Sequence, residues 1–444
     1  MSNAEGFLPR WRLKTDGVIA PDERLPTGQT VAVGLQHVVA MFGATVLAPI
    51  LMGFDPNVAI FFSGIGTLIF FVITGGRVPS YLGSSFSFIA VVIAATAYAG
   101  KGGNPNIGVA LGGIIAAGAL YAAIGLVVMA VGYAWIEKLM PPVVTGAVVA
   151  VIGLNLAPIA VKGVAGSTFD TWVALFTVFA VGAVAVFGSG MVRRLPILLG
   201  GLAGYVLYTL LTNGMGLGKP IDFSQLATAA WLGVPAFAAP RWSMEAMTLI
   251  APVAIILVAE NLGHVKAVGA MTGVSLDRYL GRAFLGDGIA TMVAGAGGGT
   301  GVTTYAENIG VMAVTKIYST LIFVVAAAAA IVLGFSPKFG ALILTIPGPV
   351  IAGLSIVVFG LITATGGRIW VQSRVDFSSP RNLIVVAFTL VAGAGDLALK
   401  LGDFTLGGIG TATFGAIILY QLLPERPGSG ETAVADGAVG EGTK

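Results

Sequence analysis

The chain has 444 residues, of which 56% are hydrophobic and only 10% are charged, and its formal net charge is +3. Soluble domains carry roughly 25% charged residues, so a soluble fold would leave too much apolar surface in water. The basic residues are scattered rather than gathered in a stripe, which argues against nucleic-acid binding. With no cysteine and two histidines, a zinc or haem site is not expected, and no cofactor is predicted.

Long apolar runs, rather than alternating ones, predict membrane-spanning helices and exclude a barrel. Residues 1–29 contain four basic side chains and no apolar stretch, so they are predicted to be a cytoplasmic segment and not a signal peptide. The sequence therefore predicts an all-α polytopic protein of the lipid bilayer. Its fourteen candidate spans lie at about 31–50, 58–74, 80–99, 108–133, 140–160, 171–190, 195–213, 246–262, 283–299, 303–315, 317–336, 340–365, 383–399 and 404–423.

The charges in the loops predict the orientation of these spans. With the N-terminus inside, eleven basic residues fall in inner loops and six in outer loops, as the positive-inside rule requires. The inner residues are Arg77, Lys138, Arg193, Arg194, Lys266, Arg278, Arg282, Lys316, Arg368, Arg374 and Arg381, and the outer ones are Lys101, Lys162, Lys219, Arg241, Lys338 and Lys400. Both termini are thus expected in the cytoplasm.

The longest polar interruption, 214–243, predicts an extracellular connector between two sets of seven spans, 30–213 and 244–423. An odd number per half forces the halves into opposite orientations, which is typical of inverted repeats with a binding site near the midplane. The third span opens with residues 81–88 and its counterpart, the tenth, with 297–305, both rich in Gly, Ser or Thr. We expect short extended segments there, each leading into a half-helix. The tail 424–444 is predicted to be disordered.

Few ionisable groups lie inside the predicted spans, and each costs at least roughly 2.5–3.5 kcal/mol to place at the bilayer centre. Glu260 and His264 are four residues apart and share a helix face. Glu307 follows the interruption of the tenth span, so these three groups are expected to converge at the break. A structural alternative stays open for Glu307, because residues 304–307 fit a capping box with Thr304 as the N-cap.

Other polar groups are expected to play supporting roles. His37, which follows Gln36 early in the first span, is predicted to hydrogen-bond to the third or tenth span. His264 has the alternative of an interfacial histidine bonded to a loop carbonyl. Asp287 and Asp396 lie near predicted span ends and are expected to be helix-terminus or cytoplasmic-gate groups.

Half-helix N-termini offer N–H donors, whereas carboxylates accept hydrogen bonds and repel anions. Donors and acceptors side by side match a neutral cyclic imide such as uracil, on which Phe86 or Tyr305 can stack. No nucleophile–base set, phosphate loop or metal cluster indicates an enzyme.

Several segments closely resemble the nucleobase-ascorbate transporters, also called nucleobase-cation symporters of type 2, and within them the bacterial uracil permeases. They are QHVVAMFGAT (36–45), YLGSSFSF (81–88), VAENLGH (258–264) and ENIGVMAVTK (307–316). The last fits the family signature of an acidic or amide residue, Asn, any residue, Gly, four residues, Thr and a basic residue. Residues 302–315 and 335–342 look especially like permeases associated with pyrimidine degradation.

The resemblance implies a core domain of spans one to four and eight to eleven, and a gate domain that mediates homodimerisation. It further implies a set of site residues. Substrate contacts are expected from Glu260, Glu307, Phe86, Ala44, Ala306 and Tyr305, proton coupling from His264 with the two glutamates, and support from Gln36, His37, Thr304 and Asn308. Ala306 departs from the pattern, because uracil permeases often have Gly there, and its methyl group can narrow the pocket. Glu307, rather than the Gln of xanthine or urate transporters, favours uracil.

The expected function is proton-coupled uracil import by alternating access in the bacterial inner membrane. Xanthine or another purine as substrate and sodium as the coupling ion stay open. An anion transporter of the sulfate-permease type is a further alternative, but it needs a basic residue where the half-helices meet, and Lys316 lies beyond that point.

Overall fold

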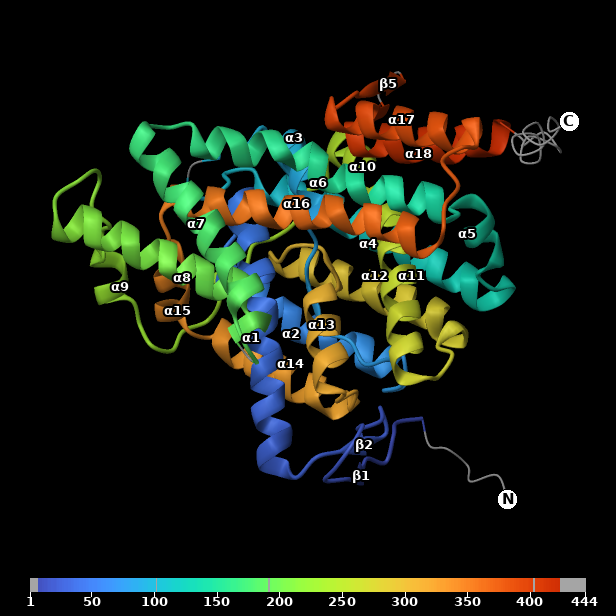
Figure 1. Cartoon of the computed structure of the whole chain (residues 1–444), viewed down its shortest axis with the longest axis horizontal. Coiled ribbons are helices and arrows are strands. Elements are labelled where there is room, and N and C mark those ends of the chain that lie inside the picture. The colour runs from blue at the N-terminus through green and yellow to red at the C-terminus, as the bar shows by residue number, and fades with distance from the viewer. Residues whose placement is uncertain (1–6, 101, 191, 402–403, 424–444) are drawn as a thin grey trace, which may run out of the picture.

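The computed structural model describes residues 7–423 except 101, 191 and 402–403, and the described chain is mostly helical (Figure 1). Its longer helices are α1 (Thr27–Met52), α2 (Pro56–Ile73), α4 (Ile107–Val131), α6 (Pro142–Val164), α7 (Thr168–Phe187), α8 (Pro196–Thr209), α11 (Val253–Thr272), α12 (Leu280–Gly297), α13 (Ala306–Thr315), α14 (Thr320–Gly334), α16 (Gly348–Gln372), α17 (Pro380–Ala394) and α18 (Gly408–Leu422). The shorter ones are α3 (Ile89–Thr96), α5 (Ala134–Leu139), α9 (Ser224–Thr228), α10 (Met244–Ile250) and α15 (Pro337–Leu344). Three two-stranded pairs join β1 (Arg12–Leu13) to β2 (Glu23–Arg24), β3 (Leu82–Ser84) to β4 (Val302–Thr304) and β5 (Leu399–Leu401) to β6 (Phe404–Leu406).

The helices confirm the predicted polytopic all-α class. Among the described residues, eight helices are long and apolar enough to cross a membrane, and the bent pair α14–α15 would make a ninth. Each predicted run overlaps at least one helix, but the third, thirteenth and fourteenth runs match only shorter apolar helices, and α12 and α13, in the ninth and tenth runs, are not among the helices counted as long and apolar enough. The count of fourteen crossings therefore stays a prediction. The predicted disordered tail, 424–444, lies outside the described residues.

The predicted run 340–365 is wrong at its start. The structure has two helices there, because α15 ends at Leu344 and α16 begins at Gly348, and α15 meets α14 at an angle of 83°. Pro347 and Pro349 lack the N–H groups that a continuous helix needs, and each disfavours helical geometry in the residue before it. Their signal is hidden by the apolar side chains on both sides, which keep the run hydrophobic across the break.

The closest helix packing joins one helix from each half of the chain. α4 packs along α12, and α6 packs along α16, as Figure 1 shows for the second pair. Glycine makes both approaches possible: a Cβ on Gly125 would lie 2.5 Å from the Leu285 nitrogen, and one on Gly366 would lie 2.3 Å from the Gly146 oxygen. Because lipid tails provide no hydrophobic drive between helices, such backbone contacts are a main source of their attraction.

Residues 7–26, here called the N-terminal strap, are docked on the helices, although the sequence predicted only a cytoplasmic segment. In Figure 1 the strap lies beneath α14 and α2. β1 and β2 pair in parallel within it, and two ion pairs, Arg12–Asp22 at 2.9 Å and Lys14–Glu23 at 3.0 Å, join the same segments. Ile19 is 1% exposed and forms a bridge with Ile317 in the α13–α14 connection.

The strap should loosen in acid because of Glu23. The Ala20 N–H donates to its carboxylate at 2.8 Å, and this bond, with the nearby Lys14 ammonium, lowers the pKa of Glu23 below its usual 4.5. A lowered pKa in the folded state stabilises the strap above pH 4.5, and this contribution is lost as the pH falls through the lowered value. We expect amide hydrogen exchange in residues 12–24, corrected for its intrinsic pH dependence, to rise below pH 4.5. Glu23→Gln should exchange equally fast on both sides of that pH, and the wild-type rise should not appear in α4.

Candidate functional site

Two extended segments, more than 200 residues apart in sequence, pair at the centre of the site. β3 and β4 run antiparallel in the register Leu82 with Thr304 and Ser84 with Val302. The pairing continues on both sides, where the Ser85 N–H donates to the Gly301 oxygen at 2.9 Å and the Tyr305 N–H donates to the Tyr81 oxygen at 3.0 Å. A 3₁₀ turn and α3 follow β3, and α13 follows β4. The expected extended segments are thus present, and two short helices begin at their junction.

Glycine allows this close approach. A Cβ on Gly83 would lie 2.5 Å from the Tyr305 ring and 2.7 Å from the Thr45 hydroxyl oxygen, and one on Gly301 would lie 2.2 Å from the Phe88 ring. Real Cβ atoms essentially never approach other atoms so closely. The glycines at the two breaks therefore weaken helix and also leave room for the aromatic rings that pack on each strand.

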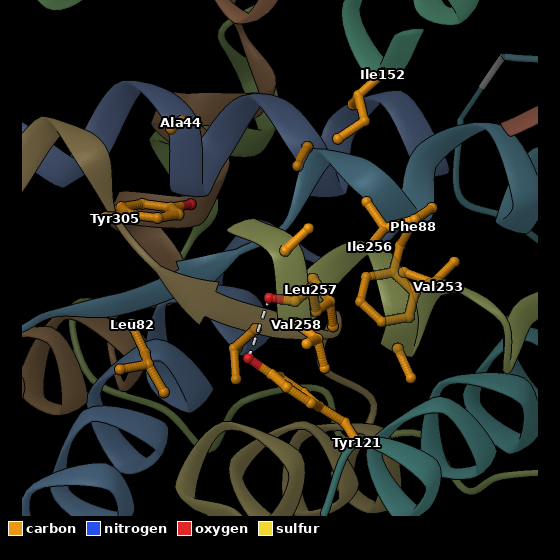
Figure 2. Packing of buried hydrophobic residues seen from close by; sticks show 14 of the residues in the cluster. Ala44, Leu82, Phe88, Tyr121, Ile152, Val253, Ile256, Leu257, Val258 and Tyr305 are labelled. Carbon is orange, nitrogen blue, oxygen red and sulfur yellow. Dashed lines mark hydrogen bonds between the residues drawn. The ribbon is translucent and has the colours of Figure 1, made fainter. Parts of the chain in front are cut away.

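Tyr305 ties the paired strands to α1. Its hydroxyl donates to the Ser84 oxygen at 2.9 Å and accepts from the Thr45 hydroxyl at 3.1 Å. Figure 2 shows its ring below the turn of α1 that carries the buried Ala44. Since Tyr305 is only 4% exposed, it braces the site. Of the two aromatic candidates for stacking, Phe86 is the one with an accessible ring.

The capping-box alternative for Glu307 is wrong. α13 begins at Ala306 with Tyr305 as its N-cap, and no side chain caps it. The Thr304 hydroxyl is instead bonded to His264 Nδ1 at 2.9 Å and to Asn261 Oδ1 at 3.3 Å. The Glu307 side chain, in the first turn of α13 and half-buried, has no part in a capping box with Thr304.

Glu260 and His264 lie on α11 beside this junction, and both are half-buried. Glu260 is within electrostatic reach of Glu307, and the bond from His264 to Thr304 links α11 to the end of β4. The expected convergence of the two carboxyl groups and the imidazole is therefore present. His264 was expected at a span end, but α11 continues to Thr272, so the histidine is interior to the helix, where its Nδ1 lies 2.9 Å from the Thr304 hydroxyl oxygen.

His37 and Asn308 hold α13 against α1. The Asn308 amide nitrogen lies 3.0 Å from His37 Nδ1 and donates to the His37 carbonyl at 3.1 Å, which is the predicted bond between the first and tenth spans. Both side chains are fully buried, and the Phe323 ring packs edge-on against the imidazole at 4.8 Å between centroids. Gln36, one residue earlier, is half-buried, and its Nε2 has no partner among the described residues.

The remaining predicted lining residues differ in accessibility. Ala306 is exposed, Phe86 is half-buried, and Ala44 is buried at the same level of α1 as Thr45. The Phe86 ring meets the Phe359 ring of α16 edge-on at 6.1 Å, so it lies where the paired half-helices face the α6–α16 pair. Ala306 thus leaves accessible surface next to Glu307, and Phe86 leaves accessible surface facing α16.

Asp287 was predicted to lie at a helix end, and this is wrong. α12 begins at Leu280, which places Asp287 in the helix interior with no exposed surface. Its Oδ2 accepts from Asn261 at 2.8 Å and from the Tyr121 hydroxyl at 3.4 Å. Because Asn261 also meets Thr304, a buried hydrogen-bonded chain runs from Asp287 towards His264. The sequence signal was the high cost of a carboxyl within an apolar helix, which requires buried partners.

The expectation that Asp396 lies at a helix terminus is confirmed. It lies two residues beyond the end of α17 with a positive φ of 51°, and its Oδ1 accepts from the Gly408 N–H at 3.1 Å. Gly408 is the first residue of α18, so the carboxylate satisfies an N–H at a helix start.

A helical membrane bundle in which two interrupted helices meet beside acidic side chains is the architecture of a solute transporter. The profile of the family described as the permease family, Xan_ur_permease, matches residues 28–402. The chain belongs to this family, that of the nucleobase-ascorbate transporters. Because the family and the curated relatives are permeases, the expectation of a transporter and not an enzyme is confirmed.

Curated relatives are similar along nearly the whole chain. The putative pyrimidine permease RutG of Escherichia coli K12 is 66% identical over 425 residues, which cover 95% of this chain and 96% of the relative. The uracil permease of Bacillus caldolyticus is 41% identical, with 93% and 96% covered, and that of Escherichia coli K12 is 37% identical, with 92% and 95% covered.

Solved structures share the fold at low identity. The transmembrane domain of the cyanobacterium bicarbonate transporter BicA matches with a TM-score of 0.60 at 15% identity, covering 88% of this chain and 96% of that one. The murine anion transporter Slc26a9 matches with a TM-score of 0.61 at 12% identity, covering 89% and 68%. At these identities the likeness concerns the fold alone.

Proposed function

We propose that this permease imports a neutral nucleobase, with uracil the best match, by proton symport across the bacterial inner membrane. The observation that carries the proposal is the pairing of β3 with β4, which brings two half-helix starts together beside Glu260 and Glu307. Relatives named as uracil or pyrimidine permeases support the same substrate class.

The chemistry of the site fits a cyclic imide. The N–H groups in the first turn of α13 donate to ring carbonyls, and the glutamates accept from ring N–H groups. The accessible Phe86 ring stacks on the base, and Ala44, Ala306 and Tyr305 shape its surroundings. The methyl group of Ala306 is exposed at the first position of α13, where it limits the size of the base.

Proton coupling is assigned to Glu307 or Glu260 together with His264. Protonation removes the charge of a carboxyl group and so lowers the cost of moving it through an apolar surrounding. His264 is linked to β4 by its bond to Thr304, so a change at the histidine is transmitted to the segment that precedes Glu307.

Movement occurs by alternating access between a core domain of spans one to four and eight to eleven and a gate domain of the remaining spans. The strong pairing of α4 with α12 and of α6 with α16 supports this division, because each pair falls within one domain. The proposal includes fourteen spans as a seven-plus-seven inverted repeat, cytoplasmic termini and a homodimer formed through the gate.

Two neighbouring functions stay as alternatives: transport of xanthine or another purine, and coupling to sodium. The anion transport named for the two structural neighbours is less compatible with this site. Two glutamates converge where the half-helices meet, and like charges repel an anionic substrate.

Uptake of radiolabelled uracil by permease-deficient cells tests the proposal. Initial rates should rise as the external medium is acidified and collapse on addition of a protonophore, because both change the driving force on the proton. Replacing sodium with choline at constant pH should change nothing. Insensitivity to pH and protonophore would remove the symport, and competition by xanthine without competition by thymine would redirect the substrate to purines.

A further inference from the structure

The N-terminal strap contacts the chain immediately after α13, the half-helix that carries Glu307. The Ile19 N–H donates to the Lys316 oxygen at 3.0 Å, and the Tyr318 N–H donates to the Ile19 oxygen at 2.8 Å. Lys316 is the C-cap of α13 and has a positive φ of 59°, a backbone conformation that residues other than glycine rarely adopt. The buried Ile19 thus pairs with both sides of a strained corner.

The strap also holds the first residue of α14. The Thr320 hydroxyl accepts from the Trp11 indole N–H at 3.0 Å and donates to the Pro21 oxygen at 3.0 Å. The Thr320 N–H donates to the same Pro21 oxygen at 3.1 Å. One side chain therefore joins two distant points of the strap to the helix that follows the site.

A second contact of the strap lies at the end of α2, before the chain enters β3. The Trp11 ring stacks on Phe71 near the end of α2 at 6.0 Å between centroids. Beyond α2, Gly75 and Gly76 have positive φ values of 67° and 63°. A Cβ on Gly76 would lie 2.6 Å from the Pro9 ring, so the turn fits closely under the strap. This turn leads within a few residues into β3.

We propose that the N-terminal strap sets the spacing of the two broken elements, with Trp11 and Ile19 as positioning residues for the substrate site. The strap joins the chain that enters β3 to the chain that leaves α13. It acts through the end of α13 on Glu307 and moves with both elements during transport. This inference rests on the proposed function for its transport readout and on the strap contacts for its geometry.

A disulfide across the bridge tests whether the strap stays in place. The chain has no native cysteine, so Ile19→Cys with Ile317→Cys introduces the sole pair. Residues bridged in this way lie within the separation that a disulfide spans. We expect the pair to form in membranes under mild oxidant, as measured by loss of maleimide labelling, and the locked protein to keep the uracil uptake that the same variant has in reductant. Failure to form, or uptake that stops on oxidation and returns with reductant, would overturn the proposal, and each single-cysteine variant is the control.

A hydroxyl deletion tests positioning. Thr320→Val removes both side-chain bonds to the strap with little change in shape. We expect the half-saturating uracil concentration to rise about three- to tenfold at an unchanged maximal rate per surface transporter, as loss of a hydrogen-bonded contact implies. Thr320→Ser, which keeps the hydroxyl, should restore the wild-type value. Thr15→Val at the exposed tip of the strap, where the hydroxyl meets only Asp16, is the matched control. An unchanged half-saturating concentration in Thr320→Val would contradict positioning.

The two proposals fail in different ways. If wild-type protein takes up no uracil while the 19–317 disulfide forms readily, the assigned substrate is wrong and the strap geometry stands. In that case the melting temperatures of Thr320→Val and Thr320→Ser, measured without substrate, still report whether the strap is bound.

Discussion

Replacing the proton-carrying glutamate by glutamine should abolish uphill accumulation of uracil, and replacing the other central glutamate should weaken uptake. A glutamine matches the protonated acid in shape and charge but cannot release a proton. We therefore expect the variant at the proton-carrying position to exchange uracil across preloaded vesicles while it no longer accumulates uracil against a gradient. The variant at the other position loses one charge-assisted bond to the base, which is worth about 1.5–3 kcal/mol and reduces uptake roughly ten- to hundredfold.

The comparison of Glu307→Gln with Glu260→Gln assigns the carrier. Exchange that survives without pH dependence identifies the coupling residue, and exchange that is weakened identifies the residue that acts mainly in binding. Glu245→Gln, in the exposed first turn of α10, is the matched control and should transport as wild type. Normal accumulation by both site variants would end the assignment of this site.

Gly83→Ala should eliminate transport through packing alone. The new methyl group would lie 2.5 Å from the Tyr305 ring and 2.7 Å from the Thr45 oxygen, so the brace between β3 and α1 must move. Overpacking typically costs about 1–3 kcal/mol, and the displaced Tyr305 hydroxyl also loses its two hydrogen bonds. We expect a lower melting temperature in detergent and loss of uracil uptake at equal surface amount.

The matched control is Gly182→Ala in α7, where a Cβ would meet no atom within 4 Å. That substitution removes a helix-interior glycine and should leave uptake intact with an equal or higher melting temperature. Wild-type uptake by Gly83→Ala would show that the close contact of Tyr305 with β3 is not required.

Much of this architecture is predictable because membrane helices leave a strong local signal. Apolar runs located the helices, and the Gly, Ser and Thr content of 81–88 and 297–305 located the two breaks. The cost of buried charge singled out Glu260 and Glu307 before any contact was known. These inferences depend on how each residue type behaves in lipid, and the residue types can be read from the sequence.

The rest depends on tertiary contacts. His264 was predicted to lie at a helix end because Gly263 and Lys266 weaken the apolar run. In the structure, α11 continues to Thr272. Asp287 was assigned to a helix terminus because its partners could not be recognised from the local sequence. They are Asn261 and Tyr121, which come from two other helices. The strap is short, and it is held by contacts with α2, α14 and the α13–α14 connection. No local pattern contains those pairings.

The glycine contacts between α4 and α12 and between α6 and α16 have a consequence for biosynthesis. In each pair the helix that is synthesised first, α4 or α6, has glycines that pack closely against a helix from the second half of the chain. Until the ribosome has delivered that half, these glycine faces have no native partner. The chain therefore cannot mature segment by segment, and its final compaction must wait for translation to pass α16.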